Sequence, residues 1–182
     1  IFYHPQIVLL RDRHDRVHVG GLAVKVHGND ANRPAGDPLF DLRRIMEPRL
    51  LAQSAPHFVE ADFAGLDDIQ KRFEKAIKAR NVTEWGRLNA DFHMAMYVHA
   101  RQPRTKAIVI ALLQTSDRYT RLQLSNTKAM GTAEKEHAHL ITLCRAKQIE
   151  EACRFLEQHI EAVRTDLLQV VGGGSIAPRA GR

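Results

Sequence analysis

Hydrophobic residues recur with a helical period along most of the chain, and this pattern predicts a helical bundle. The expected helices begin near Pro38 and then cover about residues 62–80, 83–100, 104–124, 132–146 and 148–171. Residues 125–131 lack the pattern and are expected to form a loop. No strand pattern follows residue 37, so residues 38–171 are predicted to form an all-α bundle, antiparallel where the connections are short.

Two of these helices illustrate how the apolar faces are assigned. In the first, Pro48 should cause a kink, because proline cannot donate the helical hydrogen bond. The expected core face of this first helix consists of Leu39, Leu42, Ile45 or Met46, and Leu50. The second has the clearest amphipathic pattern, carried by Phe63, Leu66, Ile69, Phe73 and Ile77.

The N-terminal segment, residues 1–37, differs in character. Apolar and polar residues alternate from Arg16 to His27 around a Gly-Gly pair, which predicts a small β-hairpin. Residues 28–38 are rich in Gly, Asn, Asp and Pro, as in turns and linkers, so we place a boundary near Asp37. At the other end, residues 172–182 begin with Gly-Gly-Gly and are expected to be a flexible tail.

Composition narrows the class of protein. The chain has 182 residues, 44% of them hydrophobic and 26% charged, as in a globular domain, and no apolar run is long enough to span a membrane. Its first residues lack the features of a secretory signal. Cys144 and Cys153 lie in helical patterns and are predicted to be free thiols in a reducing cytoplasm.

The net charge of +6 is concentrated in one stretch, because residues 101–130 hold six basic side chains and one acidic one. Such a cluster can bind nucleic acid or an anionic ligand, or can be a solvated face.

Several polar side chains are predicted to face the core. Asn89 and His93 are one helical turn apart on the third helix, beside large apolar residues. His137 and His159 fall within the apolar stripes of the fifth and sixth helices. Imidazoles and an amide oxygen from three facing helices are suited to a divalent metal, zinc or nickel foremost, with manganese or iron as alternatives. The other interpretation is that each histidine is a structural core residue with a hydrogen-bonded partner.

The remaining histidines have no such placement. Those of the N-terminal segment have no regular spacing and no neighbouring cysteines, and the others lie off the apolar stripes. We expect His4, His14, His18 and His27 to be surface residues, and His57, His99 and His139 to be surface or supporting residues.

From Leu39 to Val171 the sequence resembles the FCD ligand-binding domain found in the FadR subgroup of GntR-type bacterial transcription regulators. The resemblance is carried by Phe40-Asp-Leu-Arg-Arg-Ile-Met-Glu-Pro48, Asn89-Ala-Asp-Phe-His93, Glu136-His137 and Gln158-His159-Ile160. It implies a bundle of six or seven helices around a cavity that holds a divalent metal. The metal ligands it implies are Asn89, His93, His137 and His159. Family members have Asp or Asn at the position of Asn89. Because Asn89 is neutral, metal affinity should be lower than with Asp.

Domains of this family sense small organic acids, whose carboxylate can bind both a metal and an arginine. The resemblance implies Arg43 as an effector-binding residue, and Arg118 and Arg121 are further candidates from the basic stretch. The alternative for Arg43 is a salt bridge to Glu47 one turn later. For Arg118 and Arg121 the alternative is a position facing solvent or a subunit interface.

The leading hypothesis is therefore a cytoplasmic, homodimeric, ligand-responsive transcription regulator without enzymatic activity. Family members bind a DNA operator through a winged helix-turn-helix, and residues 1–37 are too short to form one. The predicted hairpin would be its remnant, and either part of the N-terminus is missing from the printed chain or direct DNA readout has been lost. The alternatives are a metal-dependent hydrolase or other metalloenzyme, and a metal-free helical interaction module.

Overall fold

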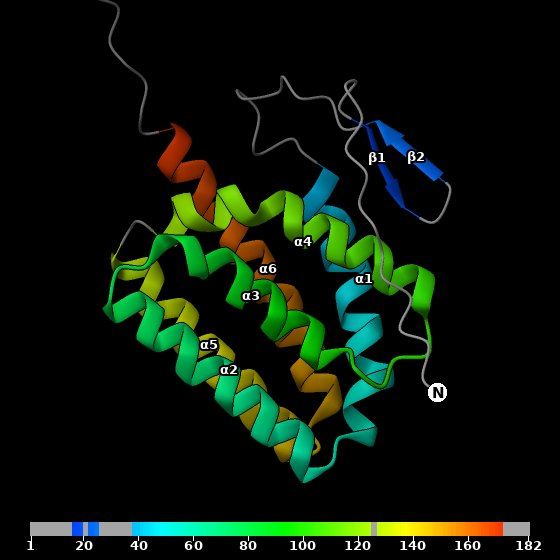
Figure 1. Ribbon diagram of the computed structural model, residues 1–182. Coiled ribbons are helices and arrows are strands. Elements are labelled where there is room, and N and C mark those ends of the chain that lie inside the picture. Colours follow the sequence, from blue (N-terminus) through cyan, green and yellow to red (C-terminus); the bar gives the residue numbers. More distant parts are fainter. Residues whose placement is uncertain (1–15, 20–21, 26–37, 125–126, 173–182) are drawn as a thin grey trace, which may run out of the picture. The chain divides into compact units, whose positions relative to one another are not determined.

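The computed structural model describes the backbone of residues 16–19, 22–25, 38–124 and 127–172, and the side chains of residues 38–117 and 131–167. Within these described residues, six α-helices form the bundle in Figure 1. Their bounds are α1 Pro38–Ser54, α2 Glu60–Lys78, α3 Val82–Met96, α4 Pro103–Leu124, α5 Thr127–Arg145 and α6 Ile149–Gly172, with a 3-10 turn at Ala55–His57 after α1. The predicted all-α bundle is confirmed.

The core is built by helices that are distant in sequence as well as by neighbours. The helix α1 packs along α6, α3 lies between α2 and α4, and α5 contacts both α2 and α6. The indole Nε1 of Trp85 on α3 donates a hydrogen bond to the Ala76 carbonyl on α2 at 3.1 Å, which joins these two helices. The interior between α3, α5 and α6 is thus enclosed by helices, and side chains on their inner faces are withdrawn from solvent.

The buried face of α1 agrees with the predicted one at Leu39 and Leu50 but differs from it between these residues. Leu42 and Ile45 are 37% and 53% exposed, while Arg43 and Glu47 are 2% and 0% exposed. The reason is that Glu47 is bonded to residues of α3, so the helix turns its charged pair inward and its two aliphatic side chains outward. Pro48 lies inside α1, as expected, and the helix continues past it to Ser54.

Two helices end at residues with positive φ. Arg80 after α2 has φ 52° and Lys147 after α5 has φ 58°. In each case the next amide N–H reaches back five residues to a carbonyl, from Asn81 to Ala76 and from Gln148 to Leu143, both at 2.9 Å. This left-handed termination satisfies the last helical carbonyls and turns the chain sharply into the following helix.

The predicted loop at 125–131 is wrong for most of its length, because α5 begins at Thr127 rather than at Thr132. Lys128, Ala129 and Met130 are good helix formers, and a single Gly131 costs a helix only about 1 kcal/mol relative to Ala. The other predicted helix bounds agree with the structure to within about four residues, a normal uncertainty for helix ends.

The N-terminal hairpin is present as strands β1 (Arg16–Val19) and β2 (Leu22–Lys25), which pair antiparallel with Val19 opposite Leu22. The predicted turn residues Gly20 and Gly21, the linker 26–37 and the tail 173–182 lie outside the described residues. The chain divides into two compact units, residues 1–33 and residues 34–182.

Cys144 and Cys153 are free thiols, as predicted. In the described ranges, none of the helices has both the length and the apolar content needed to cross a bilayer.

Candidate metal centre

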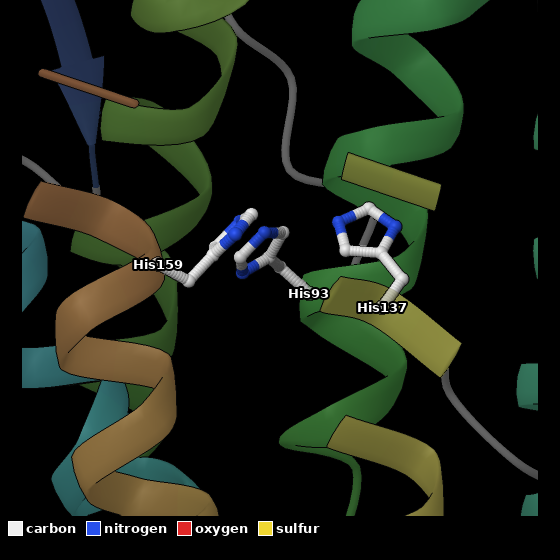
Figure 2. A group of neighbouring side chains, drawn as sticks. All are labelled: His93, His137 and His159. Carbon is white, nitrogen blue, oxygen red and sulfur yellow. The ribbon is translucent and has the colours of Figure 1, made fainter. Parts of the chain in front are cut away.

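Three histidines meet in the interior of the bundle. His93 comes from α3, His137 from α5 and His159 from α6, and Figure 2 shows their rings pointing toward one another. One ligand nitrogen from each lies within 4.8 Å of the others. The ring centroids are 5.4–5.7 Å apart, and the side chains are only 1%, 1% and 3% exposed. We call these residues the histidine trio.

A buried ionic network holds His93. Glu47 Oε2 lies 2.7 Å from His93 Nδ1 and accepts a hydrogen bond from the Tyr97 hydroxyl at 2.6 Å. Glu47 Oε1 accepts from Arg43 Nε at 2.5 Å. Burial would raise the pKa of the Glu47 carboxyl, but the nearby Arg43 guanidinium and His93 imidazole outweigh it and hold that pKa below its usual range. The carboxylate is therefore ionised and can only accept hydrogen bonds.

The ionised state of Glu47 determines the tautomer of His93. Since the carboxylate cannot donate, His93 must carry a proton on Nδ1, which leaves the lone pair of the neutral ring on Nε2. Burial lowers the pKa of His93, against the opposing effect of Glu47, so the ring is neutral near pH 7. Nε2 is the nitrogen that a metal would use.

His159 is held in a similar way and His137 in a different one. His159 Nδ1 lies 2.7 Å from Glu136 Oε2, which orients the ring. His137 instead stacks on the Phe92 ring, at a centroid distance of 4.1 Å and an interplanar angle of 11°, and contacts Phe73 at 5.3 Å. Burial, with smaller contributions from His159 and His93, lowers the pKa of His137 well below its usual value. His93 and His137 are thus neutral imidazoles with available lone pairs, and the His159 ring is oriented beside them.

The polar atoms of the trio fit a metal ion. Within the described part of the chain, His93 Nε2 and both ring nitrogens of His137 are buried without a hydrogen-bond partner. Leaving such an atom unpaired costs about 1–3 kcal/mol, so a purely structural trio is energetically unfavourable. Three converging imidazole nitrogens are a usual donor set for zinc and suit nickel, manganese or iron as well. The donor atoms present therefore match the divalent metal expected from the sequence.

The other predicted site residues have mixed placements. Asn89 is half-buried on the turn of α3 that precedes His93, and its role as a ligand stays a prediction. Arg43 forms the salt bridge to Glu47 that was the alternative for it. Arg118 and Arg121 belong to α4, but their side chains lie outside the described residues.

The remaining histidines fall away from the trio where they are described. His57 and His139 are exposed, and His99 is half-buried against Asp62, with 2.7 Å between Nε2 and Oδ2. The side chains of His4, His14, His18 and His27 lie outside the described residues.

Three residues that support the trio were not assigned to it from the sequence: Glu47, Tyr97 and Glu136. A signal was present for Tyr97, because Asn89, His93 and Tyr97 follow one another at four-residue steps on one helix face. Glu47 could not be placed, since its partner on α3 is 46 residues later in the chain. The structure places two carboxylates, Glu47 and Glu136, in contact with the trio.

Comparison with known proteins gives two matches. The FCD domain family matches residues 38–162. Among solved structures, the crystal structure of a transcriptional regulator, a GntR family member from Pseudomonas syringae pv. tomato str. DC3000, is similar with a TM-score of 0.62 and 21% sequence identity. The match covers 91% of this chain and 65% of that one, so this chain spans less than two thirds of the regulator. No curated protein matches the sequence.

Proposed function

The chain belongs to the FCD domain family, and we propose that it is the effector-binding part of a GntR-type, ligand-responsive transcription regulator. The observation that carries the proposal is the buried histidine trio, whose ligand nitrogens lie within 4.8 Å of one another, with His93 Nε2 and both ring nitrogens of His137 unpaired among the described residues. We propose that His93, His137 and His159, with Asn89, hold a divalent metal. Zinc or nickel is preferred on the basis of the imidazole donors.

The charge around the trio favours an anionic effector. All four proposed ligands are neutral, so they leave the charge of a divalent cation uncompensated. Of the two carboxylates behind the rings, Glu47 is already paired with Arg43 and Glu136 is partly exposed to water, so neither fully compensates that charge. A metal in this interior would therefore attract a carboxylate, because opposite charges interact strongly where water is excluded. This supports a small organic acid as the effector, with Arg43, Arg118 and Arg121 as further candidate contacts.

Regulation would follow from differential binding. An effector changes DNA binding only if it binds one arrangement of the protein more tightly than the other. We propose a homodimer in which the FCD domains set the spacing of paired DNA-binding heads, with the operator bound through an N-terminal domain not recognisable in residues 1–37. Membership of the FadR subgroup and a cytoplasmic location stay predictions.

A catalytic role is less well supported. Both described carboxylates that contact the trio, Glu47 and Glu136, bind the Nδ1 side of their histidines. They orient the rings, and neither is placed to take a proton from a molecule bound at Nε2. The proposed function is therefore sensing rather than turnover.

The test is an electrophoretic mobility shift with the full-length protein that contains this chain. Zinc-loaded protein and chelator-treated protein are compared on operator DNA, with and without a panel of mono-, di- and tricarboxylic acids. The expected result is DNA binding that one acid class changes only in the metal-loaded protein. Absence of DNA binding under every condition would overturn the regulator proposal.

A further inference from the structure

We propose that Glu47 is the positioning residue of the metal centre: by bonding to His93 it fixes the ring and its tautomer with Nε2 inward, and it thereby sets metal affinity. This inference rests on the metal site of the proposed function. It concerns a residue of α1 that does not itself belong to the trio.

The geometry assigns this role to Glu47 through both of its oxygen atoms. Oε1 is held by Arg43 from the preceding turn of α1, and Oε2 bridges to His93 on α3 and to Tyr97, the residue that follows α3. The carboxylate therefore has one anchored end and one end that determines which nitrogen of His93 carries the proton. Carboxylates placed behind a metal-binding histidine in this way generally raise ligand basicity, and their loss typically costs 10-fold to 100-fold in metal affinity.

Stability alone does not explain why this ion pair is buried. A buried salt bridge is often no better for stability than apolar residues of similar volume. The same helix leaves Leu42 and Ile45 largely exposed, so apolar side chains were available to cover the core. A role of the Glu47 carboxylate in orienting the His93 ring explains why the charged pair is buried next to it.

The two histidines with carboxylate partners, His93 and His159, provide an internal comparison. Glu47 has a side chain that is 0% exposed, whereas the side chain of Glu136, the corresponding partner of His159, is 21% exposed. Water can replace a partly exposed acceptor more easily than a buried one. Loss of Glu136 should therefore weaken metal binding less than loss of Glu47.

The experiment measures zinc affinity by chelator competition and the visible spectrum of the cobalt-substituted protein. Glu47→Gln keeps the shape of the side chain and removes its charge. Because that variant leaves Arg43 buried and unpaired, a second variant, Arg43→Met/Glu47→Met, removes both charges and protects the fold. Glu136→Gln provides the graded comparison. The matched control is Ser54→Ala, a buried residue two turns further along α1 whose hydroxyl accepts a hydrogen bond from the His99 N–H at 3.0 Å.

The expected result is a loss of zinc affinity of about 10-fold to 100-fold in both Glu47 variants, with an altered cobalt spectrum and a smaller loss in Glu136→Gln. The control should bind zinc as the wild type does, even though it is less stable. If both Glu47 variants remain folded with unchanged affinity and spectrum while the wild type binds metal, this inference is overturned and the metal site stands. If the wild type binds neither zinc nor cobalt, the metal site of the proposed function fails as well.

Discussion

Replacing His137 with leucine tests whether this residue is a metal ligand or a structural core residue. His137 is 1% exposed, and neither ring nitrogen has a partner among the described residues. A structural histidine is normally retained because its hydrogen bonds stabilise the fold. A metal ligand, by contrast, destabilises the metal-free protein, because its polar atoms are buried without hydrogen-bond partners.

The magnitude follows from these contacts. Removing two unpaired nitrogens should relieve about 1–3 kcal/mol each. The loss of stacking on Phe92 and Phe73 should cost about 0.5–1.5 kcal/mol for each ring pair, and the change in shape about 1 kcal/mol. Taken together, these contributions leave the metal-free variant about as stable as metal-free wild type, with a central value of about 1 kcal/mol in favour of the variant. Zinc at 100 times its Kd should stabilise only the wild type, by about 2.7 kcal/mol.

The assay is thermal unfolding followed by circular dichroism, with chelator and with excess zinc. For a domain of this size the zinc effect corresponds to a rise in Tm of about 5–11 °C. His139→Leu is the matched control, because His139 is an exposed residue two positions later on the same helix, packed edge-on against Phe155. It should keep the full zinc response. A His137→Leu variant that is clearly destabilised in chelator, or that keeps the zinc response, would refute the reasoning.

Three further outcomes are expected. Asn89→Asp should raise zinc affinity by adding a negative charge and weaken binding of an organic acid, both measurable by calorimetry. Gly86→Ala should be less stable in urea than Gly65→Ala: a Cβ at Gly86 would overlap a carboxylate of α4, whereas one at Gly65 meets open space and should stabilise α2 by about 1 kcal/mol. Burial would raise the pKa of Asp62, but hydrogen bonds from the backbone N–H of Val59, the residue before α2, and from His99 lower it overall. Its contribution of about 1 kcal/mol should therefore be present above about pH 5 and be lost as the pH falls through the lowered pKa, so urea unfolding of wild type and Asp62→Asn should converge in acid.

The sequence was sufficient for features that depend on local periodicity. The apolar stripe of α2 is read from three- and four-residue steps, and Phe63, Leu66 and Phe73 are all buried as predicted. His137 and His159 could be placed inside for the same reason, since each occupies an apolar position of its own helix. Their convergence with His93 followed because facing helices of a bundle share one interior.

Features that depend on distant partners were not accessible in this way. The middle of the α1 face was assigned from the hydrophobicity of Leu42 and of Ile45 or Met46, although the helix buries Arg43 and Glu47 there. Nothing local indicates that a carboxylate on α1 meets an imidazole on α3. Charged residues are buried when their partners are supplied by another element, and that pairing is a property of the fold rather than of the helix.

The central claim is that the histidine trio holds a divalent metal, and elemental analysis of the purified protein tests it most directly. Wild-type protein incubated with a mixture of zinc, nickel, manganese and iron salts and then desalted should retain about one metal ion per chain, as a four-ligand site of this kind binds one ion. The His93→Ala/His137→Ala double variant, treated identically and shown to be folded, should retain almost none. Equal metal content in the two proteins, or no metal in the wild type, would contradict the claim.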